Sequence, residues 1–399
     1  MAQRPDRIIA SMDTGVDDAL ALAYLLGSAD ECELSGVIAS YGNVDVNTAY
    51  ANTRAVLDLF GRADIPVFLG SEHPSWADAF IPDAGCAQFH GKDGLGNTWL
   101  AGAGALADGA GVPGDMSGDD MSVDVPDGVV SVGGYLAGDV HAHPASGSCS
   151  RVGRFRSVDR PQSATSTALV SGGTRRCSVD AADGIEYLIE QVREFGRDVT
   201  VLSTGPLTDV DAAITRAPDI ASKLRLVMMG GTLTQPGNCW DAVAETNIIQ
   251  DPEAANRVFH SGADITMVGL DVTHQCLLTR SAADRWRATG TKRGRFLADL
   301  ADFSIKANLE ADPALFSGGM PLHDPLAAAV ALDSSLVDCF DLALRAETNT
   351  GDFNGVRGRT TGDPVGLVNH SMPHVHVALG VDSGRFLDEF AERMAEVCR

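Results

Sequence analysis

Residues 7–26 read RIIASMDTGVDDALALAYLL, and this stretch decides the fold of the chain. Arg7–Met12 is a short apolar run typical of a buried strand, and it leads into the turn Asp13-Thr14-Gly15. Asp17–Gly27 has the composition of a helix with carboxylates in its first turn, where they complement the positive end of the helix dipole. A buried strand that passes through a tight turn into a helix is typical of an α/β protein.

The same alternation of strand and helix repeats along most of the chain. Further strands are expected at Leu34–Ser40, Pro66–Gly70, Val199–Ser203, Leu224–Met229, Ile265–Leu270 and His374–Leu379. Helices are expected at Thr48–Phe60, Gly184–Phe195, Asp209–Arg216, Pro252–His260, Pro325–Leu332 and Ser383–Val397, with a mostly helical stretch over Ala282–Asn308. Because right-handed crossovers join successive strands, this order predicts one large α/β domain with a mainly parallel, Rossmann-like open sheet flanked by helices.

One stretch interrupts this pattern, at about residues 101–176, and it is dense in Gly, Ser, Asp and Pro. It has little hydrophobic periodicity, and a loop of that length is uncommon inside a compact domain. We therefore expect a single domain over residues 1–399 that carries a flexible insertion at about 101–176.

The composition is that of a globular, acidic protein. Its 399 residues are 44% hydrophobic, which is enough for a substantial core. The net charge of −24 repels phosphate backbones and anionic lipids, so we expect neither a nucleic-acid partner nor a membrane partner. The first residues, MAQRPDRIIASMDTG, lack the apolar core of a secretory signal, so we expect a cytoplasmic protein.

Three carboxylates lie within one short turn, at Asp13, Asp17 and Asp18. Their mutual repulsion is unfavourable unless a proton or a cation neutralises it, and hard cations such as Ca²⁺ and Mg²⁺ prefer oxygen ligands of this kind. A cation site is therefore one interpretation of this turn. A second interpretation stays open, in which Asp17 and Asp18 only cap the helix and complement its dipole.

Other polar residues lie at predicted strand ends or open predicted helices. In an open α/β sheet, ligands bind at the carboxyl edge, where the parallel strands end. The residues expected there include Asn43, Thr204, the segment 238–247 and the pair His323-Asp324. Within that segment, Asn238, Glu245 and Asn247 offer groups suited to the vicinal hydroxyls of a sugar, although turns use the same residue types.

Taken together and in this order, these segments resemble the inosine-uridine preferring nucleoside hydrolase family over nearly the whole chain outside the insertion. The most specific element of that family is a strand followed by Asp-x-Asp-Pro-Gly-x-Asp-Asp, which Ser11–Asp18 (SMDTGVDD) matches. The supporting motifs are Tyr41-Gly42-Asn43, His90–Gly96, Ser203–Thr208, Val227–Gly231, Ala244–Asn247 running into Asp251–Ala255, and Pro321–Pro325. So many motifs in the family's order make coincidence implausible.

The resemblance implies an N-ribohydrolase that splits ribonucleosides into free base and ribose. It implies one Ca²⁺, held by the carboxylates of Asp13, Asp18 and Asp324 and by the backbone carbonyl of Thr204. Asp13 would be the general base that activates water, and His323 would protonate the departing base. The substrate-binding positions of the family match Asp17, Asn43, His90, Met229, Asn238, Glu245 and Asn247. Family members form dimers or tetramers, which implies a homo-oligomer.

The chain departs from the family motif at Ser11, where the family has its first Asp, and at Thr14, where it has Pro. We expect the missing carboxylate to hold Asp13 or the backbone in position and not to bind the ion. One alternative is a nucleoside-binding protein with impaired turnover on the same scaffold. Another is a phosphohydrolase of the haloacid-dehalogenase-like kind, which would need an Asp nucleophile at the position of Ser11.

The base side of the pocket is less well defined by the resemblance. His90 together with His323 favours the branch of the family that uses histidines there, which includes pyrimidine-preferring and broad-specificity members. The helix before His323 is expected to add contacts to the base, and Phe303 and Asn308 are the candidates.

Overall fold

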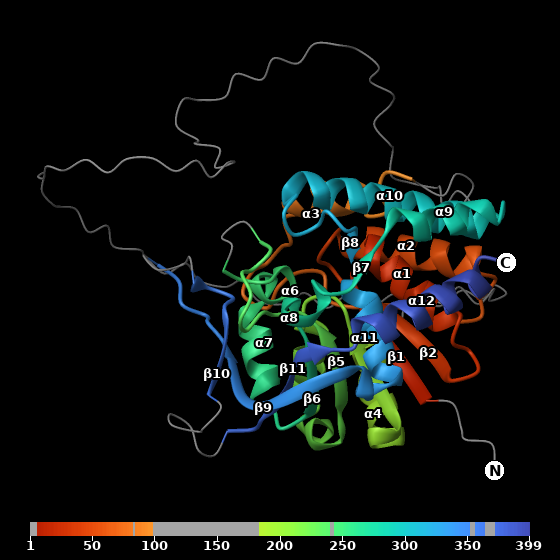
Figure 1. Ribbon diagram of the computed structural model, residues 1–399. Coiled ribbons are helices and arrows are strands. Elements are labelled where there is room, and N and C mark those ends of the chain that lie inside the picture. The colour runs from red at the N-terminus through yellow and green to blue at the C-terminus, as the bar shows by residue number, and fades with distance from the viewer. Residues whose placement is uncertain (1–5, 83, 99–182, 240–242, 352–355, 364–371) are drawn as a thin grey trace, which may run out of the picture. The chain divides into compact units, whose positions relative to one another are not determined.

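The computed structural model describes residues 6–82, 84–98, 183–239, 243–351, 356–363 and 372–399 (Figure 1). The expected insertion at about 101–176 lies outside the described residues. None of the described helices combines the length and the apolar character that crossing a membrane requires.

A nine-stranded sheet runs through the described residues in the order β10-β9-β11-β6-β5-β4-β1-β2-β3. Its strands are β1 (Asp6–Met12), β2 (Cys32–Ala39), β3 (Val67–Leu69), β4 (Val199–Ser203), β5 (Arg225–Met229), β6 (Asp264–Val268), β9 (Val337–Ala346), β10 (Thr360–Asp363) and β11 (Val375–Val381). The strands from β1 to β6 pair in parallel, and β11 joins β6 in the same direction. The predicted mainly parallel open sheet is therefore confirmed. Its antiparallel edge, β9 with β10, is an addition to that prediction.

Each helix expected from the sequence has an observed counterpart. The described helices are α1 (Val16–Leu26), α2 (Val46–Leu59), α3 (Ala84–His90), α4 (Gly184–Phe195), α5 (Thr208–Arg216), α6 (Thr246–Gln250), α7 (Pro252–Phe259), α8 (Leu270–Thr273), α9 (Arg280–Ala288), α10 (Lys292–Ala311), α11 (His323–Leu332) and α12 (Ser383–Val397). A short two-stranded pair, β7 (Leu277–Leu278) with β8 (Met320–Pro321), leads into α11.

Two hydrophobic cores form because side chains of a strand alternate between the faces of the sheet. On β1, Ile8, Ala10 and Met12 join the core shared with α1, α10, α11 and α12, whereas Ile9 joins the core shared with α4, α5 and α7. Helices therefore cover both faces of the sheet. A strand buried on both sides explains why Arg7–Met12 reads as a nearly continuous apolar run.

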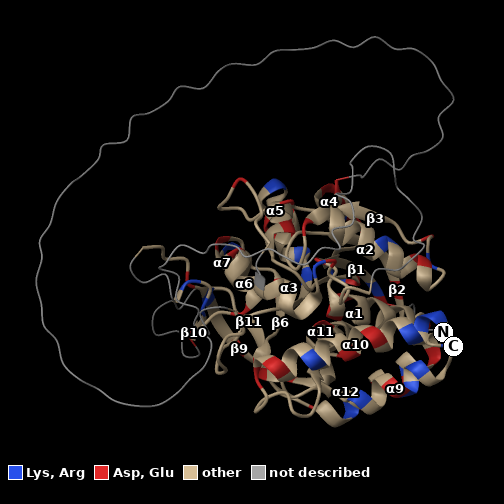
Figure 2. Ribbon diagram, turned by 90° about the horizontal axis from the view of Figure 1, so that it is seen from above, with Lys and Arg blue, Asp and Glu red and all other residues tan. Residues whose placement is uncertain are grey.

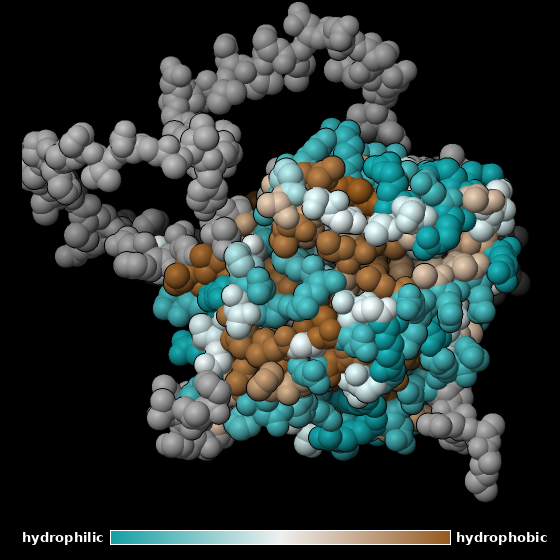
Figure 3. Space-filling view, in the orientation of Figure 1, coloured by the Kyte–Doolittle hydropathy of each residue, from teal (hydrophilic) through white to brown (hydrophobic). Residues whose placement is uncertain are grey.

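Charged residues lie on the outer sides of several of the described helices. Figure 2 shows Lys, Arg, Asp and Glu on α9, α10 and α12, away from the central strands. In the face shown in Figure 3, apolar surface is interrupted by polar residues.

Candidate active site

The carboxyl edge of the sheet brings three separate loops together. Ser11 pairs with Ile38 on β2 and with Ser203 on β4, so the segments that follow these strands begin side by side. Asp13 is fully buried, and its Oδ2 accepts a hydrogen bond of 2.7 Å from the backbone N–H of Asn43. A side chain at Gly42 would collide with the Asp13 carboxylate, so the approach of these two loops requires glycine there.

Asp18 ties the same loops to α1. Its Oδ1 accepts a hydrogen bond of 2.6 Å from the Thr204 hydroxyl, and its Oδ2 accepts bonds from the backbone N–H of Gly15 (2.8 Å) and the side-chain amide of Asn43 (3.3 Å). The Gly15 contact lies at the start of α1, so Asp18 also caps its own helix. The capping interpretation of the acidic turn therefore holds for Asp18, and its part in a cation site stays a prediction.

Asp324 reaches this point from the first turn of α11. Oxygen atoms of Asp17, Asp18 and Asp324 all lie within 4.8 Å of one another, and we call these three residues the carboxylate cluster. Burial is the main reason why the pKa of Asp17 and of Asp18 rises to about 6, and repulsion from Asp17 adds to it at Asp18. Burial, followed by the charges of the neighbouring carboxylates, raises the pKa of Asp324 well above its usual range.

Asp13 lies next to the carboxylate cluster and is not one of its three members. Burial raises its pKa well above the ordinary value, and the charges of Asp18 and Asp17 add to the effect. The Asp13 Oδ1 atom is buried and has no hydrogen-bond partner among the described residues, and the same is true of Asp17 Oδ1. A buried carboxylate oxygen without a partner is unfavourable unless a proton, a cation or a ligand satisfies it.

The carboxylate oxygen atoms of the site are suitable ligands for a hard cation. The hydrogen bonds that the described residues donate to Asp13 and Asp18 come from backbone N–H groups, an amide and a hydroxyl, and none comes from Lys or Arg. His90 Nδ1 lies 3.6 Å from Asp17, but it accepts a hydrogen bond from the Val16 N–H, so its lone pair is already committed. Concentrated negative charge with oxygen-only ligands is what Ca²⁺ and Mg²⁺ prefer, so the carboxylate cluster could hold a metal ion.

Histidines border the other side of the site. His323, the first residue of α11, forms a hydrogen bond of 2.8 Å between its Nδ1 and the Thr273 hydroxyl. Its ring centre lies 5.6 Å from that of His274. Burial lowers the pKa of His323 well below the ordinary value, and it lowers those of His90 and His274 to about 4. These rings are therefore neutral imidazoles at neutral pH in the absence of a ligand.

Thr273 and His274 were not among the sequence-based candidates. They end α8, which follows β6 at the carboxyl edge. The available signal was a polar pair only a few residues after a buried strand. The sequence predicts that strand as far as Leu270, whereas in the structure the strand ends at Val268 and Leu270 begins α8.

The expected ribose-binding residues have varied surroundings. Asn247 donates to the backbone carbonyl of Thr204 (2.7 Å) and to that of Met229 (3.2 Å), so it joins the ends of β4 and β5. Glu245 is buried and caps α6, accepting bonds from Gly231, Asn247 and Ile248. Asn238 is exposed, and its Oδ1 accepts hydrogen bonds from Thr246. The structure thus assigns all three amide and carboxylate side chains a role in local architecture, and their contact with ribose stays a prediction.

The two residues of α10 expected to contact the base, Phe303 and Asn308, have different surroundings. Phe303 is half-buried and lies against Gly96 of the His90–Gly96 loop, where an added Cβ would lie 3.1 Å from the Phe303 side chain. Asn308 is buried and donates to the Ser304 carbonyl one turn earlier in the same helix. Phe303 is therefore next to the segment that carries His90, whereas the Asn308 amide is used within α10.

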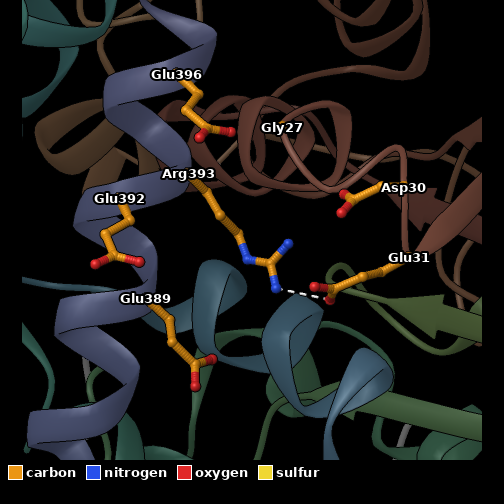
Figure 4. A pocket seen from close by; sticks show the side chains of 7 residues that line it. All are labelled: Gly27, Asp30, Glu31, Glu389, Glu392, Arg393 and Glu396. Carbon is orange, nitrogen blue, oxygen red and sulfur yellow. Dashed lines mark hydrogen bonds and ion pairs between the residues drawn. The ribbon is translucent and has the colours of Figure 1, made fainter.

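A second acidic group lies outside the site, in a surface pocket of about 200 Å³ between the end of α1 and α12 (Figure 4). Its lining residues are Gly27, Asp30, Glu31, Glu389, Glu392, Arg393 and Glu396. There the Arg393 guanidinium donates to Glu31 at 2.7 Å. The acidic residues of this pocket therefore have a basic neighbour, in contrast to the carboxylate cluster.

Comparison with known sequences decides the family. A family model described as "Inosine-uridine preferring nucleoside hydrolase" matches residues 8–388. The chain belongs to this family. The protein is therefore an N-ribohydrolase, a nucleoside hydrolase that cleaves the N-glycosidic bond of ribonucleosides. The predicted resemblance and reaction are confirmed, and the match argues against the phosphohydrolase alternative.

Individual nucleoside hydrolases match over nearly the full length. The pyrimidine-specific ribonucleoside hydrolase RihA of Enterobacter sp. (strain 638) is 30% identical over 390 residues, covering 98% of this chain and 97% of that protein. The structure of a purine-preferring ribonucleoside hydrolase from Gardnerella vaginalis matches with a TM-score of 0.72 and 34% identity, covering 98% of this chain and 99% of that one. The plant nucleoside hydrolase PpNRh1 matches with a TM-score of 0.73 and 27% identity, with the same coverage. Relatives named for opposite base preferences are thus similarly close to this chain.

Proposed function

We propose that this N-ribohydrolase depends on Ca²⁺. The observation that carries the proposal is the carboxylate cluster of Asp17, Asp18 and Asp324. It offers oxygen ligands only, and its buried Asp17 Oδ1 has no hydrogen-bond partner in the part of the chain that the structure describes. The resemblance implies that Asp13, Asp18, Asp324 and the carbonyl of Thr204 hold the ion, and two of these residues, Asp18 and Asp324, belong to the cluster, whose third member is Asp17. When bound, Ca²⁺ supplies positive charge and a flexible shell of six to eight oxygen ligands, which suits a ribose diol and a water lying side by side.

In this proposal Asp13 is the general base. Its Oδ2 is held by the Asn43 N–H, so Oδ1 is the oxygen available to take a proton from the attacking water. Negative side chains around the sugar stabilise the oxocarbenium-like charge that develops as the glycosidic bond breaks. Asp17 and Asn43 are expected to bind the ribose hydroxyls from α1 and from the loop after β2, together with Met229, Asn238, Glu245 and Asn247.

His323 is proposed to protonate the departing base. Because its Nδ1 is bonded to Thr273, Nε2 is the ring nitrogen that can face the substrate. His90, which holds the first turn of α1 through the Val16 N–H, is expected to lie on the base side as well. Proton transfer to the base needs a protonated imidazole, which has to form in the enzyme–substrate complex. There the negative charge that develops on the departing base favours the protonated form of His323.

A substrate panel with and without metal tests the proposal. Release of free base is measured for inosine, adenosine, uridine, cytidine and 5-methyluridine, first after exhaustive chelation and then after Ca²⁺ or Mg²⁺ is added back. We expect chelation to abolish hydrolysis and Ca²⁺ to restore it. Full activity after chelation would refute the metal dependence. Stabilisation of the protein by nucleosides without any base release, with Ca²⁺ present, would instead support the impaired binding protein.

Replacement of His323 by Ala is expected to lower kcat for uridine and inosine by about 10²-fold or more, because these bases leave poorly without a proton. Hydrolysis of p-nitrophenyl β-D-riboside should change little, since p-nitrophenolate departs without protonation. Steady-state kinetics on both substrate types measure the difference. His376→Ala is the matched control, because His376 lines a pocket with Arg225 at the start of β5, at the opposite edge of the sheet. Equal losses on both substrate types would remove His323 from the acid role.

The cytoplasmic location and the homo-oligomer of two or four subunits stay proposals from the sequence and the resemblance. Light scattering coupled to size-exclusion chromatography gives the molar mass in solution. A mass equal to the 41.7 kDa of one chain would contradict the oligomer.

A further inference from the structure

The departure from the family motif at Ser11 has a structural counterpart. Ser11 is buried at the end of β1, and its hydroxyl donates a hydrogen bond of 2.8 Å to Oδ2 of Asp209. Asp209 is fully buried and lies in the first turn of α5. The residue that replaces the first Asp of the motif therefore contacts a carboxylate that comes from another part of the chain.

Asp209 also holds the loop after β3. Its Oδ1 accepts a hydrogen bond of 2.7 Å from the backbone N–H of Ser71. A side chain at Gly70 would collide with the Asp209 carboxylate, so the end of β3 lies directly against it. Neutral donors from β1 and from the β3 loop thus surround this buried charge, and such charge-assisted hydrogen bonds are among the stronger ones in proteins.

These contacts connect the loops that carry the site. The Ser11 carbonyl accepts the N–H of Thr204, and the Ser71 carbonyl accepts the N–H of Tyr41. Asp13 follows Ser11 by two positions, and Asn43 follows Tyr41 by two positions. Asp209 therefore connects three segments of the site. Through Ser11 it holds the segments that carry the Asp13 carboxylate and the Thr204 carbonyl, and through Ser71 it holds the segment that carries the Asn43 amide.

We propose that Asp209 is a positioning residue for nucleoside hydrolysis, and that it supplies from α5 the carboxylate that the family motif has on β1. In the family motif the carboxylate stands at the position of Ser11, whereas here it stands at Asp209 and accepts the hydrogen bond of the Ser11 hydroxyl. A small hydroxyl at position 11 is then required, because an Asp at that position would put two carboxylates against each other in a buried site.

Moving the carboxylate back to β1 tests the proposal. The variants are Ser11→Asp, Asp209→Ser and the double variant Ser11→Asp/Asp209→Ser. For each, kcat, KM and Tm are measured in the full chain with saturating Ca²⁺, well below the lowest Tm. We expect each single variant to lower kcat at least tenfold, and the double variant to recover kcat to within a few-fold of wild type. A merely structural role would lower Tm and leave the kcat of the folded enzyme unchanged.

Two further variants keep the test decisive. Asp209→Asn retains an oxygen for the Ser71 N–H, and its amide can donate to Ser11, so its kcat should lie between those of wild type and Asp209→Ser. Asp211→Asn is the control on the same helix, because it removes the Asp211–Arg257 ion pair outside this network and should lower Tm without changing kcat. Wild-type kcat for Asp209→Ser, or a double variant as impaired as the worse single variant, would overturn the proposal. Wild-type hydrolysis is the reference throughout, so failure of the proposed calcium dependence would leave this test intact.

Discussion

An Asp324→Asn variant is expected to lose hydrolysis on the order of 10³-fold and, in the presence of a chelator, to be more stable than the wild type. In the wild type the Asp324 carboxylate lies in the carboxylate cluster with Asp17 and Asp18. An amide in its place removes one ligand of the ion and also removes the repulsion between this carboxylate and the other two. Residues that concentrate like charge for function commonly reduce stability. Thermal unfolding with chelator and with Ca²⁺, together with base-release kinetics, measures both effects.

The expected shift in the chelated protein is a rise in Tm of a few degrees, equivalent to roughly 1 kcal/mol. Addition of Ca²⁺ should stabilise the wild type and have little effect on Asp324→Asn. Glu392→Gln is the matched control, since it removes one negative charge from the surface pocket of Figure 4 and should change neither property. A chelated Asp324→Asn protein that is less stable than wild type, or that is stabilised equally by Ca²⁺, would contradict a metal role for Asp324.

The second large effect is expected at Asp13. Asp13→Asn should lower kcat by about 10³-fold or more, because the amide cannot accept a proton from water. The fold should survive, since the amide oxygen can still accept the Asn43 N–H that now binds Oδ2. Asp13→Ala removes that acceptor as well and should also weaken Ca²⁺ binding. Rates of base release and Ca²⁺ titrations followed by Tm measure the two variants side by side.

Comparison of the two variants separates catalysis from ion binding. If Asp13 acts mainly as the base, Asp13→Asn retains more Ca²⁺-induced stabilisation than Asp324→Asn at a similar loss of kcat. An Asp13→Asn enzyme with more than a tenth of the wild-type kcat would exclude Asp13 as the general base.

Local sequence predicted much of the architecture. β1 and α1 were predictable because burial on both faces gives a continuous apolar run, and a helix with acidic residues in its first turn is recognisable without any distant contact. Strand β9, which lies between β11 and the edge strand β10, was not predicted, because its burial does not alternate and its existence depends on pairing with these two strands. The start of α11 was also expected two residues later than observed, so His323 lies in the helix and not in the preceding loop.

By itself, the sequence determined the α/β alternation, the acidic turn at Asp13–Asp18 and the motifs that led to the family, because each depends on residues close together in the chain. The resemblance also implied that Asp13, Asp18 and Asp324 share an ion, but only the tertiary structure decided that Asp17 joins Asp18 and Asp324 in the carboxylate cluster. Asp324 is 306 positions beyond Asp18, and α11 brings it to α1 through core packing that no local pattern encodes. The partner of Ser11 was decided in the same way, because Asp209 approaches from α5 once β1 and β4 pair in register. Spacing along a chain specifies local elements, whereas the distance between two buried charges depends on how those elements pack.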